Sequence, residues 1–545
     1  MKRIILTLVT LIVMATMLAL AVSAETVTGS CGENVTYSFS PETGVLTISG
    51  EGDMDDYPYF EIDVDSVIKV IIENGVKSVG SDAFWGFNSL TDVVIAGSVT
   101  RIGDYAFGNC VGLTEIEIPN SVASIGEYVF DGCKNLLNIK VDVNNAYFCD
   151  VDGVLFNKDK TTLIRYPQGR VTVSYSIPDS VISIGEYAFE AAMLESITIP
   201  NGVCEINGSA FRDCIIEECS IEIPSSVSYI NGAAFSGTTL NSIDVADDNA
   251  YYTDIDGVLY NKDITELVSF PKGKDADLYD IPTTVTKIGN CGFYGNMYLK
   301  SLVIPDNVTI IRNAAFSECS SLESIQIPSS VSVIYFGLFR DCVSLKSIII
   351  PGSVTTIERS AFSGCTSLET ITIPDSAITI GDRAFEGCTA LKSIKLSNNI
   401  TAIDDRTFYG CTSLESIVIP DGVTSIGSYA FAYCENLCSA TIPTSVTSIT
   451  SRAFEDCHED LVINCYKESY ADTYAVKNGI AVKYLDEAAD SPAADVDGDG
   501  EVTLSDALVT INAVLKGEPI DGGDINGDGI VSLIDILRIM KALAA

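Results

Sequence analysis

LESIVIPDGVTSIGSYAF, residues 414–431, is the stretch that determines the fold of this chain. Its recurring apolar residues are Leu414, Ile417, Ile419, Val423, Ile426 and Phe431. Ile417 and Ile419 are two residues apart, so in a strand both face inward while Val418 faces outward. Proline cannot donate to a neighbouring strand, so Pro420 ends this strand, and Gly427 permits a second sharp bend. The stretch predicts one short coil of strands and turns.

The same pattern recurs along most of the 545-residue chain. Alignment on the phenylalanine that ends the stretch gives fourteen copies, mostly 23 residues apart, at Phe84, Phe107, Phe130, Phe189, Phe211, Phe235, Phe293, Phe316, Phe339, Phe362, Phe385, Phe408, Phe431 and Phe454. One coil alone cannot cover its apolar face, whereas stacked coils share a continuous core. The repeats therefore predict a solenoid.

Several copies of the unit resemble a known repeat family. IPDSVISIGEYAF (177–189), IPGSVTTIERSAF (350–362) and IPDGVTSIGSYAF (419–431) are similar to the BspA-type leucine-rich repeat of secreted and surface proteins. The resemblance spans about residues 66–485 and implies a β-rich leucine-rich-repeat solenoid. The entry segment 31–57 resembles the β-rich cap that precedes such repeats, and the exit segment 466–486 resembles their terminal cap.

Two matching segments, residues 144–169 and 248–273, interrupt the repeat after Phe130 and after Phe235. In each, an Asp-Gly pair (Asp152-Gly153 and Asp256-Gly257) stands between short runs of β-forming residues, which is typical of a hairpin turn. Both segments contain a D-x-D-G tetrapeptide, but apolar residues follow it where a calcium loop needs oxygen ligands. We therefore expect two inserted β-hairpins.

Cysteine is frequent, with seventeen residues in the chain. Ten of them follow the repeat phenylalanine by three residues, namely Cys110, Cys133, Cys214, Cys319, Cys342, Cys365, Cys388, Cys411, Cys434 and Cys457. One cysteine per coil indicates a buried thiol that packs as a small apolar side chain. Equivalent positions of stacked coils lie roughly 5 Å apart, so disulfides between neighbouring coils remain an alternative. Cys434 and Cys438, with His458, match no paired Cys-x-x-Cys zinc pattern.

The chain begins with Lys2, Arg3 and an uncharged, largely apolar run over residues 4–20, followed by Ala-Val-Ser-Ala at 21–24. This pattern predicts a secretory signal peptide, residues 1–24, with a retained membrane anchor as the alternative. Removing Lys2 and Arg3 changes the net charge from -42 to -44. Such an acidic chain is a poor partner for nucleic acid or anionic membranes and a good one for cations. We expect an extracellular protein that has no membrane contact once the signal is cleaved.

DVDGDGEVTLSD, residues 495–506, has the donor spacing of a calcium loop. DINGDGIVSLID repeats that spacing 29 residues later, from residue 524 to residue 535. The ligand positions are Asp495, Asp497, Asp499, Glu501, Thr503 and Asp506 in the first loop, and Asp524, Asn526, Asp528, Ile530, Ser532 and Asp535 in the second. Glu501 and Ile530 would contribute backbone carbonyls. An apolar helical run follows each loop, at 507–515 and 536–543. The sequence predicts two bound calcium ions.

Both loops end in aspartate, and Ser491-Pro492 stands too close to the first loop for an entering helix. These features resemble the dockerin module of cellulosomes, a small α-helical calcium-binding domain that docks with a cohesin on a scaffoldin. The resemblance places partner contacts at Leu504, Ser505, Ile511, Asn512 and Lys516, and at Leu533, Ile534, Met540 and Lys541. The two halves differ at most of these positions, so neither the cohesin type nor two-way docking follows from them.

The domain plan is a signal peptide (1–24), a β cap (25–65), the solenoid (66–485), a linker (486–494) and the dockerin (495–545). For the solenoid the sequence favours the first of three functions, and the other two remain alternatives. The first is noncatalytic recognition or adhesion, with a protein, cell-surface or polysaccharide ligand. The second is an enzyme such as a glycoside hydrolase acting on cell-wall polymers, although the chain has one histidine and no nucleophile elbow. The third is a structural spacer or a regulator within the assembly.

Overall fold

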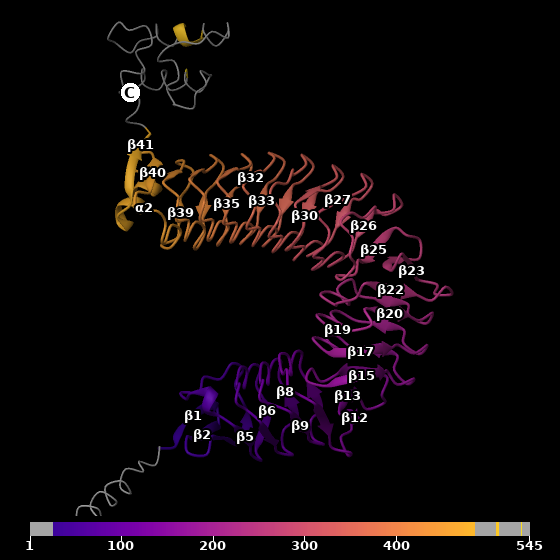
Figure 1. Ribbon diagram of the computed structural model, residues 1–545. Coiled ribbons are helices and arrows are strands. Elements are labelled where there is room, and N and C mark those ends of the chain that lie inside the picture. The colour runs from indigo at the N-terminus through magenta and orange to yellow at the C-terminus, as the bar shows by residue number, and fades with distance from the viewer. Residues whose placement is uncertain (1–24, 486–507, 512–535, 537–545) are drawn as a thin grey trace, which may run out of the picture. The chain divides into compact units, whose positions relative to one another are not determined.

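A computed structural model describes residues 25–485, 508–511 and 536, and most of residues 25–485 form stacked β coils (Figure 1). These residues belong to two compact units. The first unit runs to Asp275 and includes Cys291–Tyr294, and the second comprises Ala276–Asn290 and the residues from Gly295 onward. The predicted signal peptide lies outside the described residues. Among the described residues, no helix has the length and apolar character needed to cross a membrane.

The first unit begins with three antiparallel strands, β1 (Val27–Gly32), β2 (Val35–Ser40) and β3 (Val45–Gly50). β3 then pairs in parallel with β5 (Lys69–Ile72), the strand of the first coil. A short 3-10 helix, η1 (Val64–Ser66), lies between β3 and β5 in the chain. The antiparallel strands thus give the first coil a hydrogen-bonded neighbour, so the stack does not begin with an unpaired coil.

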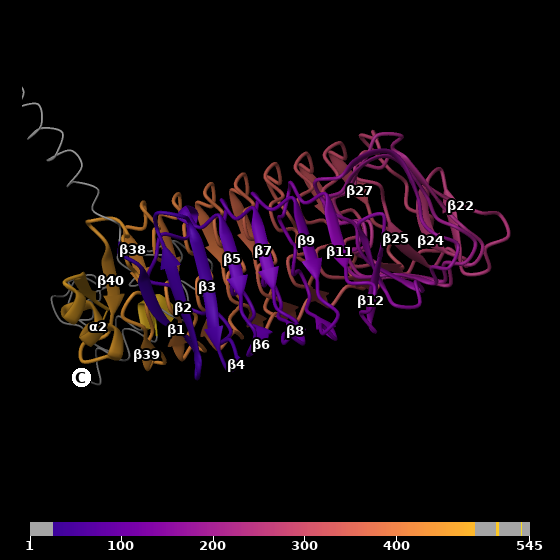
Figure 2. The same ribbon diagram turned by 90° about the horizontal axis from the view of Figure 1, so that it is seen from below.

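In most coils the L-x-x-I-x-I segment forms a strand that pairs in parallel with its neighbours. In the first unit these strands are β5, β7 (Asp92–Ile95), β9 (Glu115–Ile118), β11 (Asn138–Val141), β15 (Val171–Ser176), β17 (Met193–Thr198), β19 (Ile215–Ile216), β20 (Ser220–Ile223) and β22 (Ser242–Val245). Figure 2 shows β3, β5, β7, β9 and β11 following one another along the stack. In the second unit they are β27 (Ser301–Val303), β29 (Ser324–Gln326), β32 (Thr370–Thr372), β34 (Ser393–Lys395), β36 (Ser416–Val418), β38 (Ser439–Thr441) and β40 (Val462–Cys465). In the exit segment, β41 (Ala481–Tyr484) pairs in parallel with β40.

A second row of shorter strands follows, in most coils after the proline of the repeat unit. In the first unit it contains β4 (Gly52–Asp53), β6 (Val76–Val79), β8 (Arg101–Ile102), β10 (Ser124–Ile125), β14 (Thr162–Arg165), β16 (Ser183–Ile184), β18 (Glu205–Ile206), β21 (Tyr229–Ile230) and β25 (Glu266–Ser269). In the second unit it contains β26 (Lys287–Ile288), β28 (Ile310–Ile311), β30 (Val333–Ile334), β31 (Thr356–Ile357), β33 (Thr379–Ile380), β35 (Ala402–Ile403), β37 (Ser425–Ile426) and β39 (Ser448–Ile449). The second unit also contains α2 (Tyr470–Asn478), between Ser469, whose hydroxyl accepts from the Asp472 amide, and left-handed Gly479.

The repeat phenylalanines form a third row, with backbone hydrogen bonds from coil to coil. The Phe84 amide donates to the Ala106 carbonyl at 2.9 Å, and the Phe339 amide donates to the Ala361 carbonyl at 2.8 Å. The rings stack, as for Phe362 and Phe385, whose centroids lie 5.4 Å apart with an interplanar angle of 2°. Contact between offset, parallel rings adds to the burial of apolar surface. This column explains why phenylalanine recurs once per coil.

The inward and outward alternation predicted for the strand is confirmed, because Ile417 and Ile419 are buried and Val418 is 66% exposed. The role predicted for Gly427 is wrong. The positive φ that bends the coil is at Tyr429 (φ 57), two residues later. At Gly427, a Cβ atom would lie only 2.7 Å from the backbone nitrogen of Asp405 in the preceding coil. Glycine is needed there for close approach of two coils, not for a left-handed turn.

The two predicted hairpins are confirmed: β12 (Phe148–Val151) pairs antiparallel with β13 (Val154–Asn157), and β23 (Tyr252–Ile255) with β24 (Val258–Asn261). Each belongs to an enlarged coil rather than to an interruption of the stack. Tyr166 and Phe270 precede the next repeat phenylalanine by 23 residues and stack on it at 5.3 and 5.0 Å. The Tyr166 amide also donates to the Ala188 carbonyl at 2.7 Å, as a repeat phenylalanine does. We call the coils that contain Tyr166 and Phe270 the first and second enlarged coils.

The aspartates of the two D-x-D-G segments fasten the hairpins to the stack. Asp150 accepts hydrogen bonds from the Val141 amide at 2.9 Å and from the Gly153 amide at 3.4 Å. Asp254 accepts the corresponding bonds from the Val245 and Gly257 amides at 3.0 and 3.2 Å. These carboxylates therefore hold turns and strand ends together, in agreement with the hairpin interpretation.

The repeat cysteines are buried, with Cys457 half-buried, and no disulfide joins any of the seventeen cysteines, all of which lie within residues 25–485. Their sulfur atoms also have a polar role. Cys365 Sγ donates to the Phe339 carbonyl in the preceding coil at 3.1 Å, and Cys388 Sγ donates to the Phe362 carbonyl at 3.1 Å. Burial raises the pKa of Cys388 to about 12, so the thiol keeps its proton and is chemically inert at neutral pH. The recurring cysteine thus combines apolar packing with a hydrogen bond between coils.

Candidate functional site

The short-strand row of the first unit is broken beside the first enlarged coil. β10 is the last strand of the sheet β4-β6-β8-β10, whereas β14 belongs to a second sheet, with β13 and β16. The apolar core divides at the same place, since one buried cluster runs from Cys31 to Leu155 and another begins at Val154. At the break, β14 pairs with β16 on one side and antiparallel with the hairpin strand β13 on the other. β13 therefore takes the place where the short strand of the preceding coil would otherwise pair.

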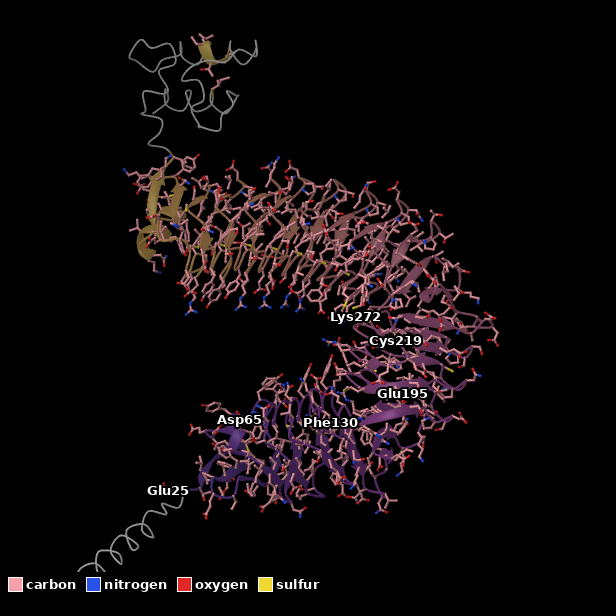
Figure 3. All side chains as sticks on the ribbon, in the orientation of Figure 1. Glu25, Asp65, Phe130, Glu195, Cys219 and Lys272 are labelled. Atoms are coloured by element: carbon pink, nitrogen blue, oxygen red, sulfur yellow. The ribbon has the colours of Figure 1, made fainter. Side chains whose placement is uncertain are left out.

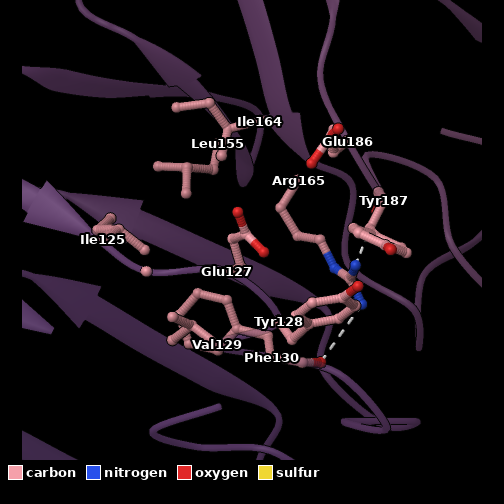
Figure 4. A pocket seen from close by; sticks show the side chains of 11 residues that line it. Ile125, Glu127, Tyr128, Val129, Phe130, Leu155, Ile164, Arg165, Glu186 and Tyr187 are labelled. Atoms are coloured by element: carbon pink, nitrogen blue, oxygen red, sulfur yellow. Dashed lines mark hydrogen bonds between the residues drawn. The ribbon is translucent and has the colours of Figure 1, made fainter. Parts of the chain in front are cut away.

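A cavity of about 170 Å3 lies at this break. Residues 125–130 form one wall, and Leu155, Ile164, Arg165, Glu186 and Tyr187 complete the lining. Most of the lining is apolar, and the side chains of Glu127 and Glu186 are the exposed polar groups (Figure 4). Neither carboxylate has a hydrogen-bond or ion-pair partner within residues 25–485. The cavity therefore combines an apolar interior with two solvated carboxylates.

Arg165 is the buried charge next to the cavity. Its side chain is 8% exposed and extends from β14 toward Tyr128 and Tyr187 (Figure 4). Nη1 donates to the Tyr187 carbonyl at 2.7 Å and to Glu190 Oε2 at 3.2 Å, and Nη2 donates to the Phe130 carbonyl at 3.5 Å. The guanidinium group thus links the coils on the two sides of the break with charge-assisted hydrogen bonds.

Glu190 neutralises Arg165 inside the protein. Its side chain is also 8% exposed, and its Oε1 lies 3.8 Å from Nη1 of Arg212 in the next coil. Burial raises the pKa of the Glu190 carboxyl, while the positive charge of Arg165 opposes that rise. Removal of Glu190 would leave the buried charge of Arg165 uncompensated, and removal of Arg165 would leave Glu190 with only the more distant Arg212.

Tyrosine side chains line the cavity near these charges. Tyr128 and Tyr187 have ring centroids 4.2 Å apart, and Tyr105 stacks on the other side of Tyr128 at 4.5 Å. Burial, followed by a hydrogen bond with Tyr187, raises the pKa of Tyr128, so its hydroxyl is neutral in solution near pH 7. The tyrosines are uncharged groups that hold the cavity wall in place.

The second enlarged coil has a break of its own, between β21 and β25, which belong to different sheets. A cavity of about 200 Å3 lies there, lined by Ser228, Ile230, Gly232, Tyr251, Tyr252, Asn261, Glu266 and Val268. The hydroxyl of Tyr252 accepts a hydrogen bond from the Ile230 amide at 2.8 Å. Gly232 lines this cavity and stands two residues after the last residue of β21, as Glu127 stands two residues after the last residue of β10. The second cavity therefore lacks a carboxylate at this position.

The predicted metal ligands, Asp495 to Asp535, lie outside the described residues, and so do all predicted partner contacts except Ile511. Ile511 is helical and half-buried. Residues 508–511 and 536 are helical, within the two helical runs expected after the loops. Among the described residues, no three or more His, Cys, Asp or Glu side chains form a cluster that would hold a metal ion. The predicted calcium sites and docking contacts therefore remain predictions.

Stacked β coils with a repeating leucine-rich strand define a leucine-rich-repeat solenoid. The model of the BspA type leucine rich repeat region matches residues 59–151, 168–276, 269–376 and 355–469. These matches cover more than half of the chain, so the chain belongs to the BspA-type leucine-rich-repeat family. The model of the dockerin type I domain matches residues 493–544. Both resemblances noted in the sequence are thereby confirmed.

Solved structures similar to the chain include a leucine-rich repeat protein from Eubacterium ventriosum, at 25% identity and a TM-score of 0.40, covering 75% of this chain and 95% of that one. A leucine rich cell surface protein from Faecalibacterium prausnitzii is 24% identical, with a TM-score of 0.29, and the match covers 84% of this chain and 99% of that one. A leucine-rich repeat protein from Bacteroides ovatus is 24% identical, with a TM-score of 0.29, covering 80% of this chain and 99% of that one. A search of curated proteins gave no match.

Inspection of the sequence missed the cavity at the first break. Arg165 and Glu190 are 25 residues apart, and no motif links them. One signal was present: Arg165 stands directly before Tyr166, a place where most other coils have a small residue such as Ala106, Ala188 or Ala361. A large charged residue at a small, buried position predicts a buried partner. Recognising it required assigning Tyr166 to the aromatic column.

Proposed function

We propose that the chain is a secreted, noncatalytic binding protein that attaches through its C-terminal segment to a cohesin of a scaffoldin, in an extracellular, cellulosome-type assembly linked to polysaccharide degradation. The observation that carries this proposal is the dockerin type I match over residues 493–544, which contain two loops with calcium-ligand spacing. A dockerin is a docking module, so the chain is delivered to a scaffold while its solenoid contacts a second partner.

The donor set of the two loops suits calcium. Carboxylate, amide, hydroxyl and carbonyl oxygens are the ligands that this hard cation prefers. Asp495, Asp497 and Asp499 supply the first three positions of one loop, and Asp524 and Asn526 begin the other. We propose one ion in each loop. So small a domain with so many carboxylates gains much of its stability from bound metal, so calcium binding and folding are expected to be coupled.

The domain plan belongs to the same proposal. A signal peptide over residues 1–24 directs secretion, a β cap and the solenoid follow over residues 25–485, and a linker at 486–494 leads to the dockerin at 495–545. The linker contains Ala, Asp, Ser and Pro and no long apolar run, which suits a tether between two folded parts.

The solenoid is proposed as the recognition part, because its coils repeat the same outward positions along a stack. In the second unit, charges alternate along one column of the strand row: Lys346 Nζ lies 2.7 Å from Glu323 Oε2, and Lys392 Nζ lies 3.0 Å from Glu369 Oε2. Charged side-chain tips project from the coils along both units (Figure 3). An extended, regularly spaced surface of this kind is what repeat proteins use for binding.

Capture by a panel of immobilised cohesins tests the attachment. The full chain is applied with calcium or with EDTA, and alongside it Asp495→Ala/Asp524→Ala, with Asp421→Ala of the solenoid surface as the matched control. We expect at least one cohesin to retain the chain and the control in calcium, and to lose both in EDTA. The double variant should be lost in either condition. Capture that is equal with and without EDTA, or absent from the whole panel, would contradict the dockerin assignment.

Incubation of the full chain with insoluble plant polysaccharides separates the roles of the solenoid. Co-sedimentation without released sugar supports a polysaccharide-binding role. Released reducing sugar would contradict the noncatalytic assignment and favour a glycoside hydrolase. If neither occurs, polysaccharide is not the ligand, and a protein or cell-surface partner or a spacer role is favoured.

A further inference from the structure

The cavity beside the first enlarged coil is a binding feature that the dockerin does not explain. We propose that it receives the side chain of a lysine, an aliphatic primary ammonium, presented by a protein partner of the solenoid. This inference rests on the proposed binding role of the solenoid and names the chemistry of its partner. It depends on three features of the cavity: its volume, its apolar wall and the charge at its mouth.

The volume favours a single side chain over a whole small molecule. Pockets for drug-sized ligands typically measure about 300–1,000 Å3, whereas this cavity measures about 170 Å3. Interfaces between proteins often concentrate their binding energy in a few anchor side chains that fill small pockets. A cavity of this size on the surface of a repeat protein therefore suits an anchor residue of a partner.

The wall of the cavity suits a chain of methylene groups. Ile125 and Val129 come from the coil before the break, and Leu155 and Ile164 come from the hairpin and β14 after it. Val129 and Leu155 are buried, while Ile125 and Ile164 are half-buried at the edge of the cavity. Because β10 and β14 belong to different sheets, these side chains meet across a gap that a flexible aliphatic chain can enter. Lysine buries its stem against such surface while its charged end stays hydrated.

The charge at the mouth favours a cation. Glu127 and Glu186 stand at equivalent places in the coils before and after the first enlarged coil, each in the sequence Gly-Glu-Tyr. Both are exposed, both line the cavity, and neither has a hydrogen-bond or ion-pair partner in residues 25–485. Two carboxylates that face one opening attract a positive charge. Figure 4 shows them on opposite sides of the Arg165 side chain.

Arg165 does not make the cavity an anion site. Its guanidinium group donates to the carbonyls of Tyr187 and Phe130 and to the carboxylate of Glu190, so these donors face protein groups. Glu190 balances its charge at 3.2 Å, and Arg212 lies near the other oxygen of Glu190. The charge that an entering group meets first is therefore that of Glu127 and Glu186.

Lysine fits this arrangement better than arginine. An ammonium group is a compact charge with three donors that can point to two carboxylates on different coils. A guanidinium group is planar and binds best to one carboxylate through two parallel hydrogen bonds. The two glutamates come from separate coils, 59 residues apart in the chain, so they offer two single acceptors rather than one fork.

Ligand-observed saturation-transfer NMR on the full chain in calcium tests the proposal. The probe is Nα-acetyl-lysine N-methylamide, with the Nε-acetylated form as an uncharged control of almost the same shape. Nα-acetyl-arginine N-methylamide and Nα-acetyl-glutamate N-methylamide test the two other charges. We expect binding of the lysine probe in the millimolar range, weakened by added salt, and no binding of its Nε-acetylated form. Equal binding of the acetylated form, or stronger binding of the arginine or glutamate probe, would overturn the proposal.

Variants assign the binding to this cavity. Glu127→Gln and Glu186→Gln should each weaken the lysine probe about two- to fivefold, the size expected for a partly exposed ion pair. Ile164→Ser should weaken it without changing its salt dependence, because that change removes apolar wall and no charge. Glu222→Gln, an exposed carboxylate on β20 of the same unit, is the matched control. Equal effects of Glu222→Gln and Glu127→Gln would show a nonspecific charge effect and overturn the site.

Circular dichroism of each variant checks that it is folded. Three of the four positions are exposed and only Ile164 is half-buried, so we expect all four variants to fold. Cohesin capture of the same samples keeps the two proposals apart. Capture without probe binding contradicts only the lysine cavity, whereas probe binding without capture contradicts only the docking proposal.

Discussion

The first and second enlarged coils each carry a hairpin, a break in the short-strand row and a cavity, of about 170 and 200 Å3. In the first, buried Arg165 links the flanking coils and is balanced by Glu190. In the second, the corresponding residue is Ser269, which is buried, and the Tyr252 hydroxyl accepts from the Ile230 amide. The same backbone arrangement therefore accommodates either a buried ion pair or a neutral side chain at this position.

The difference also shows where binding chemistry can arise in a repeat protein. Inside the stack, each coil satisfies its neighbour through backbone ladders, the aromatic column and the cysteine thiols. At the first enlarged coil, where the short-strand row is broken, a side chain links the flanking coils, and Arg165 and Glu190 there are the buried charged residues of the part of the chain that the structure describes. The two breaks therefore allow a direct comparison of how a different side chain at one position changes stability.

The largest effect is expected from Arg165→Met. This substitution removes the closer positive charge and leaves buried Glu190 with only Arg212 at 3.8 Å, and breaking a buried pair typically costs about 3–5 kcal/mol. Ser269→Ala, the matched change in the second enlarged coil, should cost about 1 kcal/mol or less, because only one neutral hydroxyl is lost. Hydrogen exchange of peptides covering residues 160–190 and 264–294 measures each local stability, since a solenoid need not unfold in one step.

A double variant separates charge from packing at this pair. Arg165→Met/Glu190→Leu should recover most of the loss, because a buried ion pair replaced by apolar side chains of similar size is often neutral or stabilising. If the double variant is as unstable as Arg165→Met, the guanidinium group acts through its hydrogen bonds to Tyr187 and Phe130, and not through charge balance.

A pH effect is expected from Cys133, in the coil before the first enlarged coil. Burial raises its pKa from 9.0 to about 12. Between those values the unfolded chain loses the thiol proton that the folded chain keeps, so stability falls as pH rises, by about 1.4 kcal/mol per pH unit. The coil before the second enlarged coil has Thr238 at this position, whose hydroxyl donates to the Phe211 carbonyl at 3.2 Å.

Cys133→Thr therefore tests the comparison directly. Hydrogen exchange between pH 8 and 10, corrected for its intrinsic pH dependence, should show a shallower loss of stability around residue 133 in the variant than in the original chain. Thr238→Cys should make the loss steeper around residue 238. Identical slopes in all three proteins would contradict the assignment of the effect to the buried thiol.

A smaller loss is expected from Tyr252→Phe, which removes the hydroxyl that partners the Ile230 amide. The net contribution of such a hydrogen bond is about 1 kcal/mol. Tyr251→Phe is the control, because Tyr251 is 55% exposed and adjacent in the chain. Exchange of the Ile230 amide should quicken only in Tyr252→Phe, and equal exchange in both variants would show that water replaces the hydroxyl.

The smallest effect is expected at the hairpin tips. Lys274 Nζ lies 3.0 Å from Asp256 Oδ2, but the Asp256 side chain is 82% exposed. Asp256→Asn should change stability by about 0.5 kcal/mol or less, since exposed ion pairs contribute little and asparagine also tolerates the left-handed backbone (φ 51). Asp152→Asn in the first hairpin should behave in the same way. A loss above about 1 kcal/mol in either would indicate that the tip is packed against another part of the chain.

Local patterns predicted much of this fold. A period-two strand, a proline and a recurrent phenylalanine recur at constant spacing, so burial of Ile417 and Ile419 and exposure of Val418 followed from the sequence. The two hairpins followed from Asp-Gly turns between β-forming runs. The role of Gly427 did not follow from the sequence. Close approach of two coils and a left-handed turn both favour glycine, and sequence alone does not distinguish them.

The candidate cavity was beyond such reasoning. Tyr166 and Phe270 are in register with the phenylalanines that follow them, but the hairpins hide that register from an alignment. Without it, Arg165 has no assigned place, and its partner Glu190 is 25 residues away. Glu127 and Glu186 likewise become neighbours of one cavity only when the coils on either side of the enlarged coil are stacked.

The sequence by itself determined the repeat, the direction of its apolar residues, the family and the presence of a dockerin segment, because each of these depends on residue types at short, constant spacing. The tertiary structure decided how the enlarged coils join the aromatic column, why the recurring residue is cysteine, and which charges meet at the broken strand row. These features depend on contacts between coils, where buried side chains 23 or more residues apart must satisfy each other's hydrogen bonds and charges.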